Sequence, residues 1–127
     1  MIINIPSSLG ELLDKISILL IKKSIIIEHD KLKHVSNELS KLQSVLNSIK
    51  ISRTKVEKYI NELKEINLKL WNIEDEIREY EKDNFFEDKF IHLARSVYKF
   101  NDQRSKIKLR INREFDSEIV EVKSYKG

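Results

Sequence analysis

The sequence of 127 residues has no cysteine, one proline and two glycines. Without cysteine, disulfides and thiolate metal sites are excluded, and the chain fits a reducing cytoplasm. So little glycine and proline is untypical of β-sandwiches and barrels. The longest apolar run, residues 16–21, is too short to span a bilayer, and the N-terminus lacks the features of a signal peptide. We therefore expect a cytoplasmic protein that does not bind membranes.

Hydrophobic residues (40%) and charged residues (35%) are both abundant, and the formal net charge is only +3. This balance is typical of long amphipathic helices. A chain of this length forms one domain, so we assign residues 1–127 to a single helical-bundle domain.

An apolar seam with alternating spacings of three and four residues extends from Val56 to Tyr80, which is the heptad pattern of coiled coils. Similar seams extend from Leu32 to Ile49 and from Phe86 to Ile111, the last one containing the charged Arg104. Short connections make neighbouring helices antiparallel. The sequence thus predicts an all-α, antiparallel up-down helical bundle with coiled-coil-like seams and about four long helices, at residues 9–28, 31–49, 55–82 and 85–113.

The predicted helix 9–28 has apolar residues over more than half of its circumference. A helix of this kind is surrounded by other helices, either of its own chain or of a second copy. We therefore expect a homo-oligomer that forms through this helix. Extending the next seam backwards would place Glu11 and Asp14 in it, so we expect a turn near residues 28–31.

Three local signals mark helix starts: Ser8 with Glu11 and Thr54 with Glu57 match the capping box, and Asn84 precedes the last helix. Both ends of the chain are rich in β-branched residues. We therefore hypothesise a small terminal β pairing between residues 1–5 and 119–122.

Polar residues of the last two helices lie level with one another when the two helices are laid antiparallel about a turn near Asp83. This register predicts an ion-pair layer beside a polar layer that also includes Asn67. The candidate polar-network or ligand-binding residues are Glu74, Asp75, Arg78, Arg95, Asn101, Asp102 and Arg104.

Two interpretations of this network stay open. Charged residues four apart on a helix commonly form surface pairs, and a polar residue in a seam commonly fixes register. Alternatively, Arg78, Arg95 and Arg104 line a pocket for a small anionic ligand that carries carboxylate or phosphate. In that case the protein is a small-molecule enzyme with Glu74 or Asp102 as acid or base.

A weaker anion-site candidate is the start of the first helix, at Ser8 and Gly10, because free amides at a helix N-terminus can bind phosphate. The alternative is that Ser8 caps the helix and Gly10 permits close packing.

Other site types find little support. Seven basic residues stand against two acidic ones in residues 95–114, but the segment lacks interleaved aromatics, so we do not expect nucleic-acid binding. Glu11 and Asp14 resemble the carboxylate clusters of all-α nucleotide pyrophosphohydrolases, yet the full Mg²⁺ constellation is not evident. We predict no metal and no cofactor, and assign no catalytic residue.

Several phrases occur together along nearly the whole chain: Leu9-Gly10-Glu11-Leu12-Leu13-Asp14-Lys15-Ile16, Leu70-Trp71-Asn72-Ile73-Glu74-Asp75-Glu76-Ile77-Arg78, Leu93-Ala94-Arg95-Ser96-Val97-Tyr98, Asn101-Asp102-Gln103-Arg104 and Lys123-Ser124-Tyr125. In combination they resemble an uncharacterised bacterial and phage family of small helical proteins, a domain of unknown function. The resemblance implies a cytoplasmic binding or accessory protein, sometimes found in surface-polysaccharide or glycosyltransferase contexts. It brings no catalytic residues.

Overall fold

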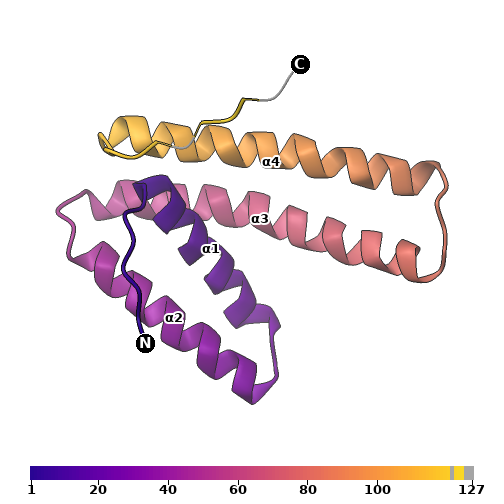
Figure 1. Ribbon diagram of the computed structural model, residues 1–127, viewed down its shortest axis with the longest axis horizontal. Coiled ribbons are helices and arrows are strands. Elements are labelled where there is room, and N and C mark those ends of the chain that lie inside the picture. Colours follow the sequence, from indigo (N-terminus) through magenta and orange to yellow (C-terminus); the bar gives the residue numbers. More distant parts are fainter. Residues whose placement is uncertain (121, 125–127) are drawn as a thin grey trace.

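The computed structural model describes residues 1–120 and 122–124 and shows four helices in two hairpins (Figure 1). They are α1 (Leu9–Ile25), α2 (His29–Asn47), α3 (Arg53–Lys82) and α4 (Asp88–Glu114). The predicted all-α fold is confirmed, and each helix end lies within three residues of its predicted position.

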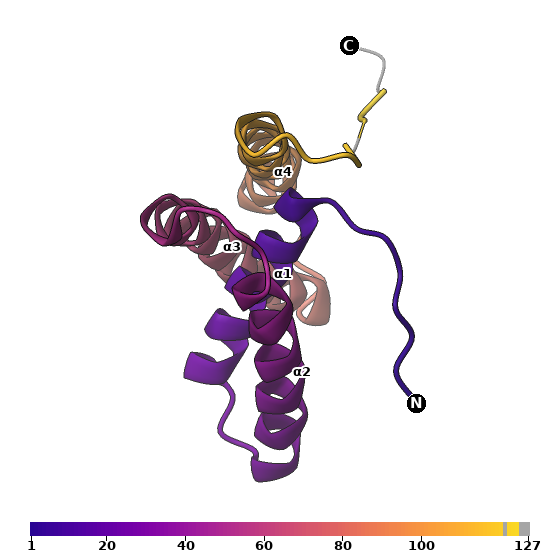
Figure 2. The same cartoon turned by 90° about the vertical axis from the view of Figure 1, so that its left-hand side faces the viewer.

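Helix α1 occupies the centre of the molecule and packs against each of the other three helices. The α1–α2 hairpin crosses the long α3–α4 hairpin obliquely, so the two hairpins do not lie side by side along their whole length (Figures 1 and 2). Of the other three helices, α2 has close backbone contacts with α1 and with neither α3 nor α4. The apolar breadth of α1 is therefore used within its own chain, and an oligomer through α1 stays a prediction.

One hydrophobic core joins all four helices. Its buried side chains are Leu13, Ile16 and Leu19 of α1, Val35, Leu39 and Leu46 of α2, Val56, Leu63, Ile66 and Leu70 of α3, and Ile107 and Ile111 of α4. No residue between Leu70 and Val97 belongs to this core, although the structure describes all of that stretch. We call the part that surrounds the core the base (residues 9–70 and 97–117).

Beyond the base, α3 and α4 continue as a projecting two-helix arm, residues 71–96 (Figure 1). Leu93, 8% exposed, is the one buried apolar side chain of the arm, all of whose residues the structure describes. Without a third helix over it, the arm keeps much of its apolar surface in contact with water. The arm and the base therefore have different surfaces.

The turn between α3 and α4 is a Schellman motif, in which a left-handed residue closes the end of a helix. Asn84 takes a φ of 54°, and the Phe85 N–H donates to the Tyr80 carbonyl at 2.8 Å. The rings of Phe85 and Tyr80 lie 6.3 Å apart, the hydrophobic contact expected of this motif. The tip of the arm is thus a defined turn.

Helix α4 also ends in a Schellman motif. Asp116 also has a φ of 54°, and the Ser117 N–H donates to the Asn112 carbonyl at 2.8 Å. The reversal brings the Ser117 hydroxyl to the start of α1, where it accepts a hydrogen bond from the Leu9 N–H at 3.2 Å. The last helix thereby helps to cap the first.

The helix starts agree only in part with the capping signals. The Ser8 hydroxyl accepts from the Glu11 N–H at 3.1 Å as predicted. At α3 the cap is Ser52 and not Thr54, and at α4 it is Glu87 and not Asn84. Asn84 is used instead in the preceding left-handed turn, so it cannot also begin the next helix.

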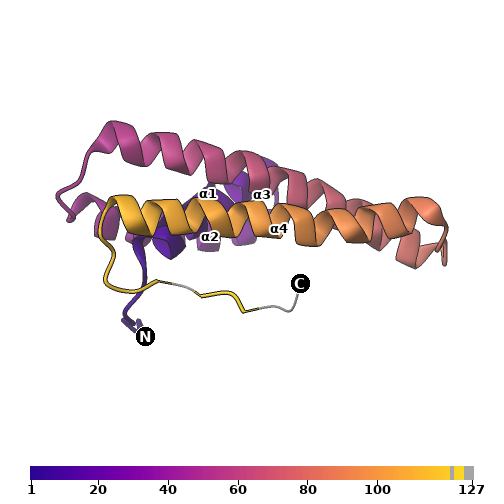
Figure 3. The same cartoon turned by 90° about the horizontal axis from the view of Figure 1, so that it is seen from above.

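The hypothesised β pairing of the termini is wrong for the described residues, none of which lies in a strand. Residues 1–5 extend away from the bundle, with the Ile3 side chain 74% exposed, whereas the chain after Ser117 turns back along α4 (Figures 2 and 3). The two segments leave the helices in different directions; position 121 lies outside the described residues. None of the helices is both long enough and apolar enough to cross a bilayer.

Candidate functional site

The predicted ion-pair layer lies on the surface of the arm. Glu74 and Arg78 approach to 4.0 Å, with their side chains 51% and 80% exposed. Asp75 and Arg95 are exposed as well, and neither forms an ion pair with a described residue. Solvent screens such pairs, so this layer contributes little to stability.

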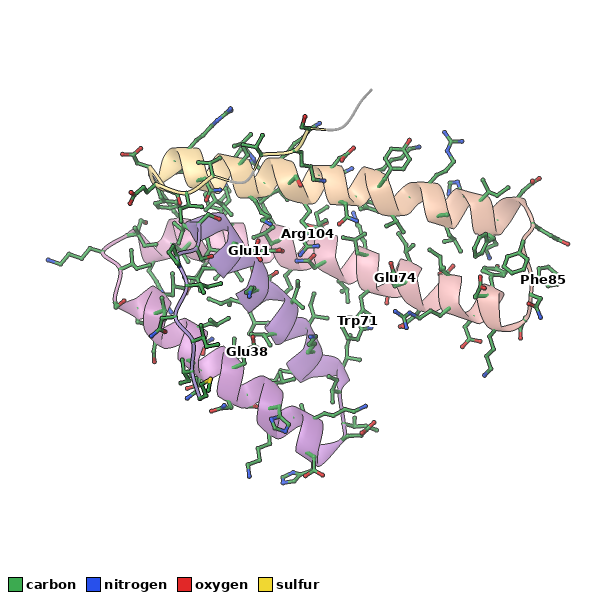
Figure 4. All side chains as sticks on the ribbon, viewed as in Figure 1. Glu11, Glu38, Trp71, Glu74, Phe85 and Arg104 are labelled. Carbon is green, nitrogen blue, oxygen red and sulfur yellow. The ribbon has the colours of Figure 1, made fainter. Side chains whose placement is uncertain are left out.

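The predicted polar layer is divided between two sides of α4. Asn67 and Arg104 point inward and meet at one carboxylate, that of Asp14. Asp102 lies on the surface, where it pairs with Lys123 at 3.5 Å, and Asn101 is half-buried. Arg104 therefore belongs to the base, and Figure 4 shows it near Glu11 and away from Glu74 on the arm.

The centre of the inward-facing group is Asp14, whose side chain is completely buried. Its carboxylate accepts from Asn67 Nδ2 at 2.8 Å and from Arg104 Nε at 3.0 Å to each oxygen. The guanidinium also reaches it through a second nitrogen, so the contact is bidentate. A buried carboxylate needs such donors, because burial without them is strongly unfavourable.

Two further side chains complete the arrangement around Asp14. Ser17 donates to the Asp14 carbonyl at 2.6 Å and accepts from Asn67 at 2.9 Å. Lys108 contacts Glu11 at 2.7 Å and Asp14 at 3.9 Å. We call this set the Asp14 cluster: Glu11, Asp14, Ser17, Asn67, Arg104 and Lys108. Its two acids balance its two bases, and α1, α3 and α4 all contribute to it.

The start of α1 packs tightly against α4 beside this cluster. The Gly10 N–H donates to Asn112 Oδ1 at 2.8 Å, and a Cβ at Gly10 would lie 2.7 Å from the Lys108 carbonyl oxygen. Glycine is therefore required here by the close approach of two backbones. The contacts of Gly10 with α4 thus agree with the alternative in which this glycine permits close packing.

An anion at this helix start would need free backbone amides. The first three amides of α1 already have acceptors within the chain: the side chains of Ser117 for Leu9, Asn112 for Gly10 and Ser8 for Glu11. The Leu12 N–H donates to the Ser8 carbonyl at 3.2 Å. This occupancy favours capping over ligand binding at Ser8 and Gly10.

The cluster is chemically closed. Among the described residues, every buried side-chain nitrogen or oxygen has a hydrogen-bond partner, and no group of three or more metal-ligating side chains is present. Arg104, Lys108 and Lys123 have further partners besides those given above. An adjoining cavity of about 20 Å³, lined by Ser105, Lys108, Leu109, Asn112 and Lys123, has only about the volume that one water needs. Such an arrangement joins α1, α3 and α4.

At the surface of the base, the Tyr59 hydroxyl donates to the Glu114 carboxylate, which Lys55 approaches at 3.3 Å. This hydrogen bond is the main cause that raises the pKa of Tyr59 and lowers the pKa of Glu114. Arg110 stacks over the Tyr59 ring, 5.8 Å from its centroid. Helices α3 and α4 are thus also joined at the edge of the core.

The other surface features are apolar and basic. Phe85, Phe86 and Ile91 of the arm are 49%, 51% and 53% exposed. On the base, α4 carries an open groove of about 540 Å³ lined by Gln103, Lys106, Ile107, Leu109, Arg110 and Arg113. Neither feature was among the predicted sites.

Sequence reasoning missed Asp14 and Lys108 as members of the Asp14 cluster, and Asn112 as the acceptor of the Gly10 N–H beside it. A signal was present, since the backward extension of the α2 seam placed Glu11 and Asp14 at apolar seam positions. A charged residue at a buried position needs an opposite charge, and Arg104 was the charged residue in the seam of α4. Pairing the two would have located the cluster.

A profile described as "Family of unknown function (DUF6165)" matches residues 1–127. None of the curated proteins and none of the solved structures compared with the chain matches it. The match confirms the resemblance to an uncharacterised family, since it covers the entire chain. This chain therefore belongs to the DUF6165 family, whose function is unknown.

Proposed function

We propose that this protein is a helical binding protein whose arm is the surface offered to a partner protein. The observation that carries the proposal is the exposure of Phe85, Phe86 and Ile91, each about half exposed. Large aromatic side chains supply much of the energy of protein interfaces, and grouped apolar residues on a surface mark interaction sites.

The shape of the arm supports the proposal. The α3 seam continues into the arm, where Ile73, Ile77 and Tyr80 are half-buried. We infer that α3 and α4 pair there as a short antiparallel coiled coil, because heptad spacing holds two helices together over such a length. A stiff projection with an aromatic end is suited to reaching a partner.

The closure of the Asp14 cluster favours this function over an enzyme with an arginine-lined pocket. Arg104 is held by the Asp14 carboxylate, and Arg78 and Arg95 lie on the exposed arm. A ligand carboxylate would have to displace Asp14 from Arg104 and leave it buried without its guanidinium donor, which is unfavourable.

The setting that we propose is an accessory role in the cytoplasm, in surface-polysaccharide or glycosyltransferase pathways. The pathway rests on the family resemblance alone. The absence of cysteine supports the compartment, because a chain without disulfides needs no oxidising environment.

Site-specific photocrosslinking tests the function of the arm. A photoreactive phenylalanine replaces Phe86 in one variant and Val45 of α2 in another, because both side chains are 51% exposed. After irradiation of cells that produce these variants, we expect a discrete adduct from position 86 and none from position 45. Equal labelling at the two positions, or no adduct at position 86, would contradict the proposal.

A further inference from the structure

The arm ends in a tip, residues 81–88, that combines apolar and acidic side chains. Phe85 and Phe86 lie at its centre, and Glu81, Asp83, Glu87 and Asp88 surround them, against the single base Lys82. All of these side chains are exposed, and none of the four acids forms an ion pair with a described residue. The tip therefore presents an aromatic pair inside an acidic border.

The groove on α4 has the opposite character. Leu109, half-buried, provides apolar surface beside the buried Ile107, and the cations of Lys106, Arg110 and Arg113 border it. Arg110 contacts Glu62 at 3.1 Å, whereas Lys106 and Arg113 are exposed and pair with no described acid. A ligand with an apolar centre and an acidic edge would match this groove in both respects.

The tip cannot reach the groove of its own chain. Asp88 and Arg110 belong to the same straight helix, and 22 residues of α-helix separate them by about 33 Å. Any contact between tip and groove therefore involves two molecules.

We propose that the tip of one copy docks in the α4 groove of a second copy. The inference rests on the proposed function of the arm and names its partner. Phe85 and Phe86 contact Leu109 in the groove, while the acids of the tip face Lys106 and Arg113. Complementary charge fixes the orientation of such an interface, and the aromatic pair supplies its apolar contact.

The contact gives a closed dimer when each copy inserts its tip into the groove of the other. Two copies with antiparallel arms place each tip in the other copy's groove, which gives a two-fold dimer with two identical contacts. The two-fold axis then passes midway between tip and groove.

A charge exchange tests the dimer. The tip variant carries Glu81→Lys and Asp83→Lys, and the groove variant carries Lys106→Glu and Arg113→Glu. Lysine at the C-terminal end of α3 interacts favourably with the helix dipole, so the tip variant should fold. The control variant, Asp30→Lys with Glu38→Lys, makes the same charge change as the tip variant at exposed positions of α2. Thermal melts of all four proteins verify folding.

Sedimentation velocity then measures mass. We expect the wild type and the control to be dimers of the 15.1 kDa chain. Each variant alone should have a dimer dissociation constant raised roughly 10- to 100-fold, because like charges meet at both contacts. An equimolar mixture of the two variants should restore the dimer, since every tip then faces a groove of opposite charge.

Three results would overturn the proposal: a monomeric wild type, variants that stay dimeric, or a mixture that stays monomeric. Filaments would also overturn it, because head-to-tail contacts do not close. The photocrosslinked adduct at position 86 distinguishes failure of the dimer from failure of the proposed function of the arm. An adduct of twice the chain mass supports the dimer, whereas an adduct with another protein keeps the function of the arm and removes the dimer.

Discussion

Helices α3 and α4 pass through both the base and the arm, but only the base also contains α1 and α2. The α3 seam passes through both regions. In the base its members Val56, Leu63 and Leu70 are at most 8% exposed. In the arm its members Ile77 and Tyr80 are half-buried. The seam thus determines which side of α3 faces α4 along the entire hairpin, whereas burial depends on whether α1 covers that hairpin.

Polar residues differ between the two regions in the same way. In the base, Asp14 is fully buried and bound by Asn67 and Arg104. In the arm, Glu74 and Arg78 are exposed and in marginal contact. A third helix converts polar side chains into a buried network that must be fully satisfied. Substitutions in the base should therefore cost more stability than matched substitutions in the arm.

Loss of the central carboxylate should be the most damaging change. Asp14→Leu leaves Arg104 and Lys108 beside a buried apolar side chain, and breaking a buried ion pair destabilises by roughly 3–5 kcal/mol. Glu74→Leu on the arm should change the free energy of unfolding by less than about 1 kcal/mol. Urea denaturation of both variants measures the difference; equal losses would mean that the two regions do not differ.

A double variant separates an unpaired charge from lost packing. Asp14→Leu combined with Arg104→Met removes both charges of the pair, so it should be more stable than Asp14→Leu alone. If the double variant is the less stable of the two, the damage comes from packing. Urea denaturation again provides the comparison.

The seam itself can be probed in each region. Leu63→Ala deletes a fully buried side chain of the base and should lower the free energy of unfolding by roughly 2–5 kcal/mol. Ile77→Ala acts on a half-buried side chain in the arm, where the site can collapse and water is already present, so its effect should be clearly smaller. Thermal and urea unfolding of this matched pair would refute the contrast if Ile77→Ala were as harmful.

Gly10→Ala should reverse an ordinary helix preference. Alanine normally stabilises a helix by about 1 kcal/mol relative to glycine. Here the added Cβ would lie 2.7 Å from the Lys108 carbonyl, so we expect a loss of roughly 1–3 kcal/mol from overpacking. Asn72→Ala on the exposed face of the arm is the control and should be neutral or stabilising. A stabilised Gly10→Ala variant would show that α1 and α4 can separate there without loss.

The smallest expected effect is a pH dependence at the edge of the base. The hydrogen bond from Tyr59 holds the pKa of Glu114 below its ordinary value of 4.5, so its stabilisation is complete above that value and is lost as the pH falls through the lowered pKa. Glu114→Gln should therefore reduce the acid sensitivity of the melting temperature slightly. Glu74→Gln on the arm is the matched control, and an equal effect there would contradict the assignment.

Helix positions could be predicted from the sequence because apolar periodicity is a local property. That α3 and α4 pack against each other was also accessible, since one short turn joins them. The oblique crossing of α1 was not, because crossing angles depend on which ridges of side chains interlock. Without the crossing angle, the sequence could not show that α1 packs over Leu63 and does not reach Ile77.

The polar residues illustrate the same limit. Asn67 and Arg104 were predicted to share one polar layer, and both donate to Asp14, whose carboxylate lies in α1 and was assigned to no partner. Spacing within one helix identified Glu74 and Arg78 as a pair, which they are. It could not tell that this pair is exposed whereas Arg104 is inside, since that distinction depends on a third helix.

The capping of α1 by Ser117 has a consequence for the order in which the protein matures. The acceptor of the Leu9 N–H lies 108 residues downstream, and the guanidinium that binds Asp14 lies 90 residues downstream. The ribosome therefore delivers α1 first, α2 and α3 next, and the α4 partners of α1 last. Until α4 has emerged, Asp14 lacks its guanidinium partner and Leu9 lacks its cap, so contacts of such high sequence separation make completion of the base a late event in folding.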